Sequence, residues 1–174
     1  MIAWGQPGSD SAAGGRTQLL SQRAEVAVGP GTIAGNGMRL GLPTGWTGRI
    51  KIGGDLGGLP ILQAGSFPLP TPDDDVGSVA ERGLAPGAVY VNIIHYDTAP
   101  TRLDRSVQTT LPIRLQPAAF AQTYEGAIAP THAREAAVVA GEYFVIDVSL
   151  GESHGPSAQL LGVANRVLST FRPS

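Results

Sequence analysis

The 174-residue chain contains no cysteine, which excludes disulfides, thiolate metal sites and a cysteine nucleophile. Charge is also scarce, since charged side chains make up 15% of the chain against roughly 25% in typical globular proteins. Twelve basic and fourteen acidic residues leave a formal net charge of -2. This balance gives no strong field to attract nucleic acid or an anionic bilayer, so the composition disfavours both as partners.

Long apolar runs are missing as well. No stretch approaches the roughly 20 residues that a membrane-spanning helix needs. The first residues have neither the basic region nor the apolar region of a signal peptide. We therefore expect no membrane insertion and, for the chain as written, a cytoplasmic location. A location outside the cytoplasm would require a signal or an anchor further upstream.

Glycine and proline are abundant, with 24 and 14 residues, and they predict many turns. The length suits one domain of roughly 100 to 200 residues. Residues 1–22 have little periodic apolar content and are predicted to form a flexible N-terminal arm, followed by a single domain at 23–174. Trp4 in this arm is a candidate contact residue for another subunit, because aromatic side chains often anchor interfaces.

The clearest element of the domain is a strand from Glu142 to Leu150, whose alternate residues are apolar. The preceding run, Ala133 to Ala140, is predicted to pair with this strand through a turn that takes in Ala140 and Glu142. The segment Pro156 to Phe171 follows, with apolar side chains at helical spacing. We expect this C-terminal helix to pack on the apolar face of the sheet.

A second strong strand runs from Ala88 to Asp97, and apolar residues on both of its faces predict a central position in the sheet. Other segments have the composition of strands or of helical turns. The further predicted strands are Ala24–Val28, Met38–Leu42, Arg49–Ile52, Pro60–Leu69 and Leu111–Leu115, and the predicted helical turns are Ser78–Leu84 and Pro117–Gln122. The sequence thus predicts an α+β fold with a mostly antiparallel sheet and a packed C-terminal helix.

The histidines give the first candidate for catalysis. No two of His95, His132 and His154 have the spacing of a metal site. His95 and Asp97 lie two residues apart on one strand and could form an acid–base pair. A solvated structural pair is the commoner outcome of this spacing.

Asp73, Asp74 and Asp75 offer carboxylate oxygens to a hard cation, although calcium loops place their ligands at alternate positions. The glycine-rich stretch Gly53–Gly58 lacks the Gly-Lys-Ser/Thr ending of a phosphate-binding loop. The sequence therefore indicates no cofactor. Tyr143 is predicted on the strand face opposite the core, where it is a candidate contact residue for a protein partner.

The stretch Met38 to Trp46, Met-Arg-Leu-Gly-Leu-Pro-Thr-Gly-Trp, resembles the opening strand, proline, glycine and tryptophan of Mog1/PsbP-like domains. The ending, Val167 to Arg172, is similar to their closing helix and short final strand. This resemblance covers residues 24–172 and implies an antiparallel sheet sandwiched by helices. It also implies a family of binding or accessory modules, including actinobacterial surface proteins, whose members are generally not enzymes. The glycine-rich insert, the irregular middle and the missing lipobox cysteine depart from the family pattern.

These observations support three hypotheses of function. The first is a non-catalytic binding or assembly module, as a subunit or extracytoplasmic domain of a larger bacterial assembly, with a protein partner or self-association. The second is a small hydrolase or metal-dependent enzyme that uses His95 and Asp97. The third is a structural protein of a viral or particle shell, suggested by the low charge and the many glycine- and proline-rich loops.

Overall fold

The computed structural model describes residues 26–53, 57–70, 84–99, 107–121, 123–124, 127–128 and 131–174. The predicted arm with Trp4, the acidic stretch Asp73–Asp75 and most of the helical turn predicted at Ser78–Leu84 lie outside the described residues. Among the described residues, no helix has both the length and the apolar character needed to cross a membrane.

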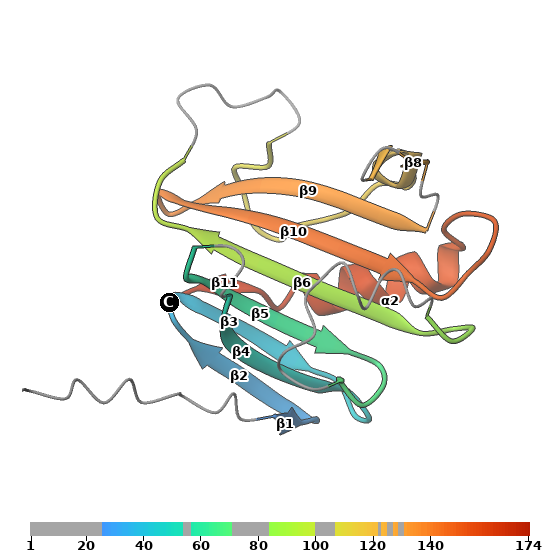
Figure 1. Ribbon diagram of the computed structural model, residues 1–174, viewed down its shortest axis with the longest axis horizontal. Helices are drawn as coiled ribbons and strands as arrows, with labels where there is room; N and C mark the ends of the chain where they lie inside the picture. Colours follow the sequence, from blue (N-terminus) through green and yellow to red (C-terminus); the bar gives the residue numbers. More distant parts are fainter. Residues whose placement is uncertain are drawn as a thin grey trace, which may run out of the picture.

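Six strands form one antiparallel sheet in the order β1-β4-β5-β6-β10-β9 (Figure 1). They are β1 (Ala27–Val28), β4 (Thr47–Gly53), β5 (Leu59–Gly65), β6 (Val89–Tyr96), β10 (Glu142–Leu150) and β9 (His132–Val139). β6 lies between β5 and β10, which confirms the central position predicted from its two apolar faces. β9 and β10 form the predicted pair.

A smaller antiparallel sheet has the order β11-β3-β2, with β2 at Gly31–Gly35, β3 at Met38–Leu42 and β11 at Arg172–Pro173. A further pair joins β7 (Thr123–Tyr124) to β8 (Ala127–Ile128). β2 was not predicted from the sequence. It reads Gly-Thr-Ile-Ala-Gly and buries only Ile33, so it has almost no apolar alternation.

The C-terminal helix α2 spans Ala158–Leu168 and begins at Ser157, whose hydroxyl accepts a hydrogen bond from the Leu160 backbone N–H. The helix ends at Leu168, earlier than predicted, and two hydroxyl groups bond to its last carbonyls. The Ser169 hydroxyl donates to Arg166 O at 2.7 Å, and the Thr170 hydroxyl donates to Val167 O at 2.6 Å. Phe171 therefore enters the core from the connection to β11.

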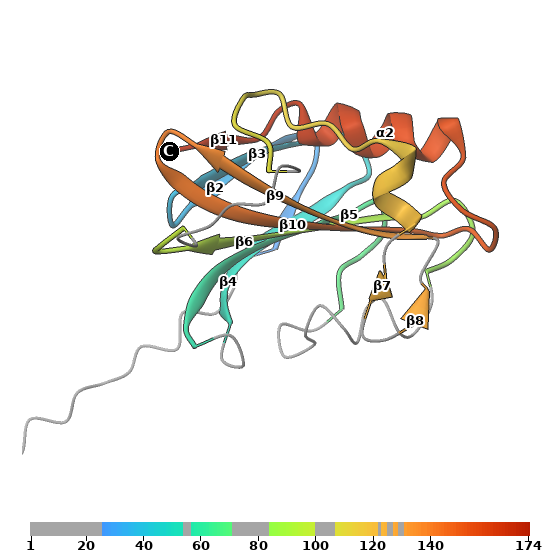
Figure 2. The same cartoon turned by 90° about the horizontal axis from the view of Figure 1, so that it is seen from above.

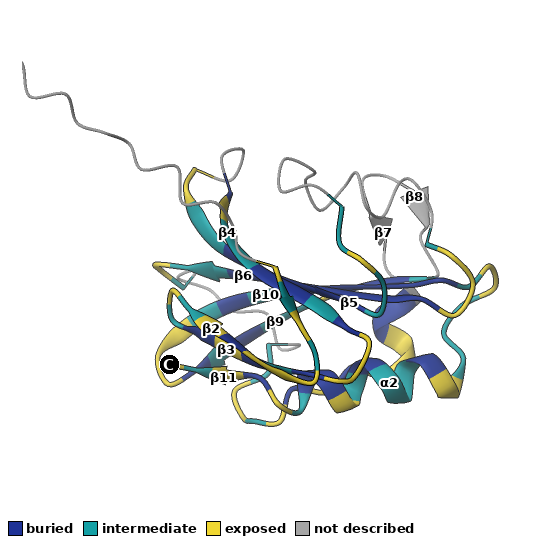
Figure 3. Cartoon of the chain, turned by 90° about the horizontal axis from the view of Figure 1, so that it is seen from below, coloured by how far each residue is buried: buried dark blue, intermediate teal, exposed yellow. Residues whose placement is uncertain are grey.

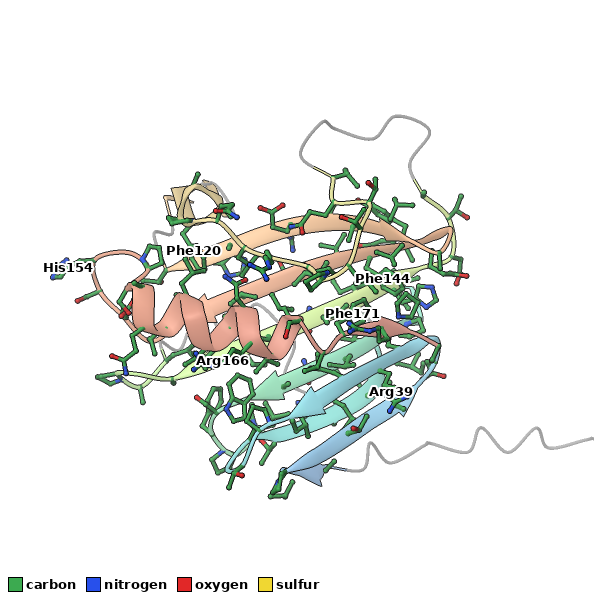
Figure 4. The ribbon with its side chains drawn as sticks, turned by 180° about the vertical axis from the view of Figure 1, so that it is seen from behind. Arg39, Phe120, Phe144, His154, Arg166 and Phe171 are labelled. Atoms are coloured by element: carbon green, nitrogen blue, oxygen red, sulfur yellow. The ribbon has the colours of Figure 1, made fainter. Side chains whose placement is uncertain are left out.

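The elements stack in layers. Figure 2 shows α2 and the three-stranded sheet on one side of the six-stranded sheet, with β7 and β8 on the other. The core lies between the six-stranded sheet and α2, and the middle of β5, β6 and β10 is buried (Figure 3). The Phe144 and Phe171 rings meet edge to face there, with centroids 5.1 Å apart (Figure 4). The described residues therefore form an α+β fold with a mostly antiparallel sheet, as predicted.

The prediction of a strand at Leu111–Leu115 is wrong. Ile113 and Leu115 are buried in the core, but the only bridge to a strand in this part of the described chain joins Gln108 to Ala137. The side chain of Asn165 on α2 makes the hydrogen bonds to the backbone of Leu115 that a neighbouring strand would otherwise make. The Leu115 N–H donates to Asn165 Oδ1 at 2.8 Å, and Asn165 Nδ2 donates to Leu115 O at 3.1 Å. The predicted helical turn that follows is confirmed as the 3₁₀ helix η1, Pro117–Ala121.

The turn between β9 and β10 consists of Ala140 and Gly141, with φ of 55° and 85°. Glu142 is instead the first residue of β10, paired with Val139. Two residues with positive φ form the tight hairpin turn that favours Asn-Gly, and alanine is strained at the first of these positions. We expect Ala140→Asn to raise the free energy of unfolding by about 0.5–1 kcal/mol, measured by urea denaturation. Ala140→Val, with a β-branched side chain at the same φ, should lower it, and equal stabilities of the two variants would contradict this account.

Candidate functional site

The candidate site is a row of polar side chains across the far face of the six-stranded sheet, the face turned away from α2. The strand registers place its members directly opposite one another. In order across the sheet they are Arg49 on β4, Gln63 on β5, Asn92 on β6, Asp147 on β10 and Arg134 on β9. We call these five residues the polar row. All but Arg134 are at most 1% exposed, which is rare for such side chains unless they are paired.

One end of the polar row is held by Arg49. Its Nε donates to Gln63 Oε1 at 2.7 Å, and its Nη1 donates to the backbone carbonyl of Pro70. Pro70 belongs to the segment 66–70, which folds over this end of the far face. The Thr47 hydroxyl fixes the same segment, because it donates to Phe67 O at 2.6 Å and accepts from the Leu69 N–H at 3.1 Å.

The other end of the polar row is an ion pair. Arg134 Nε donates to Asp147 Oδ1 at 2.7 Å, and Arg134 Nη2 donates to Oδ2 at 3.2 Å. His132 Nε2 lies 3.4 Å from Asp147 Oδ1, and His132 Nδ1 lies 2.9 Å from the Ser149 hydroxyl. Burial raises the pKa of Asp147, but hydrogen bonds and charges from His132 and Arg134 outweigh it, so this pKa lies below its ordinary value.

Between these two ends lie polar atoms without hydrogen bonds. Gln63 Nε2 and both side-chain atoms of Asn92, Oδ1 and Nδ2, are buried and have no partner among the described residues. Most buried polar groups in proteins are paired, and each unsatisfied group costs about 1–3 kcal/mol. The unmet hydrogen-bonding capacity is therefore concentrated at the centre of the sheet, on two neighbouring strands.

His95 lies on the opposite face of the sheet, at the end of β6. Its Nε2 is 2.7 Å from Glu142 Oε2, and its Nδ1 is 3.2 Å from the Asn36 carbonyl. The ring stacks on Phe144, with centroids 4.8 Å apart. Both ring nitrogens are thus engaged by groups other than Asp97, and His95 links the β2–β3 turn to β10. This arrangement favours a structural role for His95.

We expect His95→Ala to lower the free energy of unfolding by about 2–3 kcal/mol, because it removes two hydrogen bonds and the stack on Phe144. His154 provides the control, since it is exposed on the loop before α2 and points away from the fold (Figure 4). His154→Ala should leave stability within about 0.5 kcal/mol. Equal unfolding midpoints for the two variants in guanidinium chloride would argue against the structural role.

The remaining predicted site residues are not brought together. Asp97 is exposed just beyond β6. Tyr143 lies half-buried on the far face, opposite Tyr96, with ring centroids 5.5 Å apart. Trp4 and Asp73–Asp75 fall outside the described residues. Among the residues that the structure describes, no group of three or more acidic or histidine side chains could hold a metal ion.

The sequence reasoning missed the polar row, although each strand carries a signal for it. Gln63 is flanked by Leu62 and Ala64, and Asn92 and Asp147 likewise lie between apolar neighbours within predicted strands. A single polar residue in the middle of a buried strand indicates a buried polar group. The register that aligns these residues on five strands comes only from the tertiary structure.

Comparisons of the chain with protein-family models, with curated proteins and with solved structures find no match. The Mog1/PsbP-like resemblance therefore stays a prediction. The described residues form an α+β domain with the polar row on one face of its larger sheet.

Proposed function

We propose that the chain is a non-catalytic binding module whose binding surface is the polar row. The observation that supports it is the burial of Asn92 and Gln63, whose amide atoms have no partner among the described residues. A leucine or valine at either position would avoid the desolvation cost of these amides. Polar groups in the centre of a sheet are explained if they bond to a ligand that the chain binds.

The sheet supplies the rigidity that a binding site needs. β5 and β6 are paired on both sides within the six-stranded sheet, so the backbone positions of Gln63 and Asn92 are fixed before a ligand arrives. Arg49 further fixes the Gln63 amide through its 2.7 Å hydrogen bond. Preorganised donors and acceptors lose little entropy on binding.

Ser149, His132 and Asp147 favour a second candidate function, a hydrolase, because a hydroxyl, an imidazole and a carboxylate lie in series. Two observations rank it lower. Asp147 already pairs with Arg134 through both carboxylate oxygens. Ser149 lies in a strand paired on both sides, so its own N–H serves the sheet ladders and does not face an oxyanion. This candidate uses none of the residues of the His95 and Asp97 hypothesis.

Side-chain NH₂ signals of ¹⁵N-labelled protein test the binding proposal. The probes are acetamide, acetate and methylammonium, titrated into the wild type and into Asn92→Leu. We expect at least one probe to shift the Asn92 and Gln63 signals of the wild type to saturation, with no saturable shift of the Gln63 signal in the variant. The proposal fails if none of the three does so. Hydrolysis of 4-nitrophenyl acetate that is lost in Ser149→Ala would instead favour the hydrolase.

The assembly role, the particle-shell role and the Mog1/PsbP-like arrangement with helices on both faces of the sheet stay predictions. Native mass spectrometry of the full chain and of a chain lacking residues 1–22 distinguishes them from a binding module. A monomer in both samples would count against assembly and shell roles. An oligomer that requires the arm would favour them.

A further inference from the structure

We infer that the middle of the polar row binds a cis-amide group, meaning a primary carboxamide or a lactam. This inference rests on the proposed binding function and adds the chemical class of the ligand. It uses the atoms that are buried without partners among the described residues, Asn92 Oδ1, Asn92 Nδ2 and Gln63 Nε2.

Asn92 offers an acceptor and a donor side by side on one amide edge. A group that satisfies both needs its own donor next to its own acceptor. An amide with N–H and C=O on the same side has this pattern, and it forms two parallel hydrogen bonds with the Asn92 amide. Either orientation of the Asn92 amide provides such an edge, so the inference does not depend on which atom is oxygen.

Gln63 supplies a further donor whose direction is fixed. Because the guanidinium of Arg49 can only donate, the atom of Gln63 that it contacts at 2.7 Å must be the oxygen. The Gln63 NH₂ group is therefore turned away from Arg49. Gln63 lies directly opposite Asn92, on strands that are about 4.8 Å apart. A ligand carbonyl that accepts from Asn92 Nδ2 can use its second lone pair to accept from Gln63 Nε2.

The charges along the polar row favour a neutral ligand. The negative charge of Asp147 is matched by Arg134, and Arg49 donates to Gln63 and to the Pro70 carbonyl. The two amides between these ends carry no charge. A neutral amide placed there loses less hydration energy than an ion would. Gln63 and Asn92 are both 0% exposed, so a group that bonds to their amides is shielded from water there.

The experiment compares 2-pyrrolidinone, a lactam with a cis N–H, with N-methyl-2-pyrrolidinone, which keeps the carbonyl and lacks the donor. Both are titrated into the ¹⁵N-labelled full chain, with acetate as the anionic probe, and the Asn92 and Gln63 side-chain NH₂ signals are followed. We expect saturable shifts with the lactam and binding about tenfold weaker with its N-methyl derivative, because one hydrogen bond is lost. Asn92→Leu should abolish the lactam shift of Gln63, and Asn165→Leu should preserve it.

Three other results would contradict the inference. Equal binding of the two lactams overturns the inference, because the donor then contributes nothing. Tighter binding of acetate overturns it in favour of an anion site and leaves the proposed binding function intact. No saturable shift with either lactam, with acetamide, with acetate or with methylammonium overturns both. The comparison of the two lactams uses only wild-type protein, so it stands even if Asn92→Leu fails to fold.

Discussion

Replacing Asn92 by leucine is expected to raise the free energy of unfolding by about 1–3 kcal/mol in ligand-free protein. Leucine is close to asparagine in shape, and it removes a buried amide that has no partner among the described residues. The substitution thus removes a desolvation cost and adds apolar burial at the centre of the sheet. Urea denaturation of wild type and variant under identical conditions measures the difference. The same variant should lose the binding of small amides.

The matched control is Asn165→Leu, the same chemical change at an asparagine whose amide is satisfied. Asn165 on α2 makes two hydrogen bonds to the backbone of Leu115. Its replacement leaves a part-buried N–H and carbonyl unpaired, so stability should fall by about 1–3 kcal/mol. Opposite signs for the two substitutions are therefore expected. A loss of stability in Asn92→Leu similar to that in Asn165→Leu would mean that the Asn92 amide is already satisfied in the free protein.

The second large effect is expected for Asp147→Asn, which should lower the free energy of unfolding near neutral pH by about 3 kcal/mol. Removal of one partner from a buried ion pair typically costs 3–5 kcal/mol, and the lower end applies because Arg134 is half exposed. The change removes the carboxylate that pairs with Arg134 and faces His132. Guanidinium chloride denaturation measures it.

The pH dependence of this effect has a definite sign. Hydrogen bonds and charges of His132 and Arg134 hold the pKa of Asp147 below its ordinary value, against the opposing effect of burial. A carboxyl group whose pKa is lower in the folded state stabilises the protein above the unfolded-state pKa of about 3.9. That contribution disappears as the pH falls through the folded-state pKa. The stability difference between wild type and Asp147→Asn should therefore shrink on acidification below about pH 4.

Asp97→Asn is the control for this prediction, because Asp97 is an exposed aspartate just beyond β6. Its stability should stay within about 0.5 kcal/mol of the wild type. If the difference between wild type and Asp147→Asn were the same at pH 3 and pH 7, the ion pair would not be the source of the effect.

If Asn92→Leu stabilises the protein and Asp147→Asn destabilises it, the polar row is best explained by a role in binding. Asn92 would then lower the stability of the free protein while providing the ligand contact, and Asp147 would hold one end of the row in place. Functional sites often keep residues that reduce stability. A sheet evolved for packing alone would place apolar residues at Gln63 and Asn92.

Local patterns in the sequence were sufficient for the main elements. Period-two alternation predicted β10, a run with apolar residues on both faces predicted β6, and helical spacing predicted α2. Apolar residues on both faces of β6 also predicted its central position, which the structure confirms. β2, with one buried side chain, and the core segment around Ile113 and Leu115 lack such patterns. β2 is held by its pairing with β3, and the segment around Ile113 and Leu115 is held by the Asn165 side chain.

The candidate site was decided by the tertiary structure. Arg49, Gln63, Asn92, Asp147 and Arg134 come from five strands spread over 99 positions of the sequence, and nothing in their local spacing relates them. Strand order and register put them in one row, because a shift of one residue in any pairing would turn a side chain to the opposite face. The opposite holds for His95 and Asp97, which are two residues apart in the sequence. The His95 ring contacts Glu142 and Asn36 and not Asp97. The sequence by itself determined the main strands and the helix, while only long-range pairing determined which polar side chains meet.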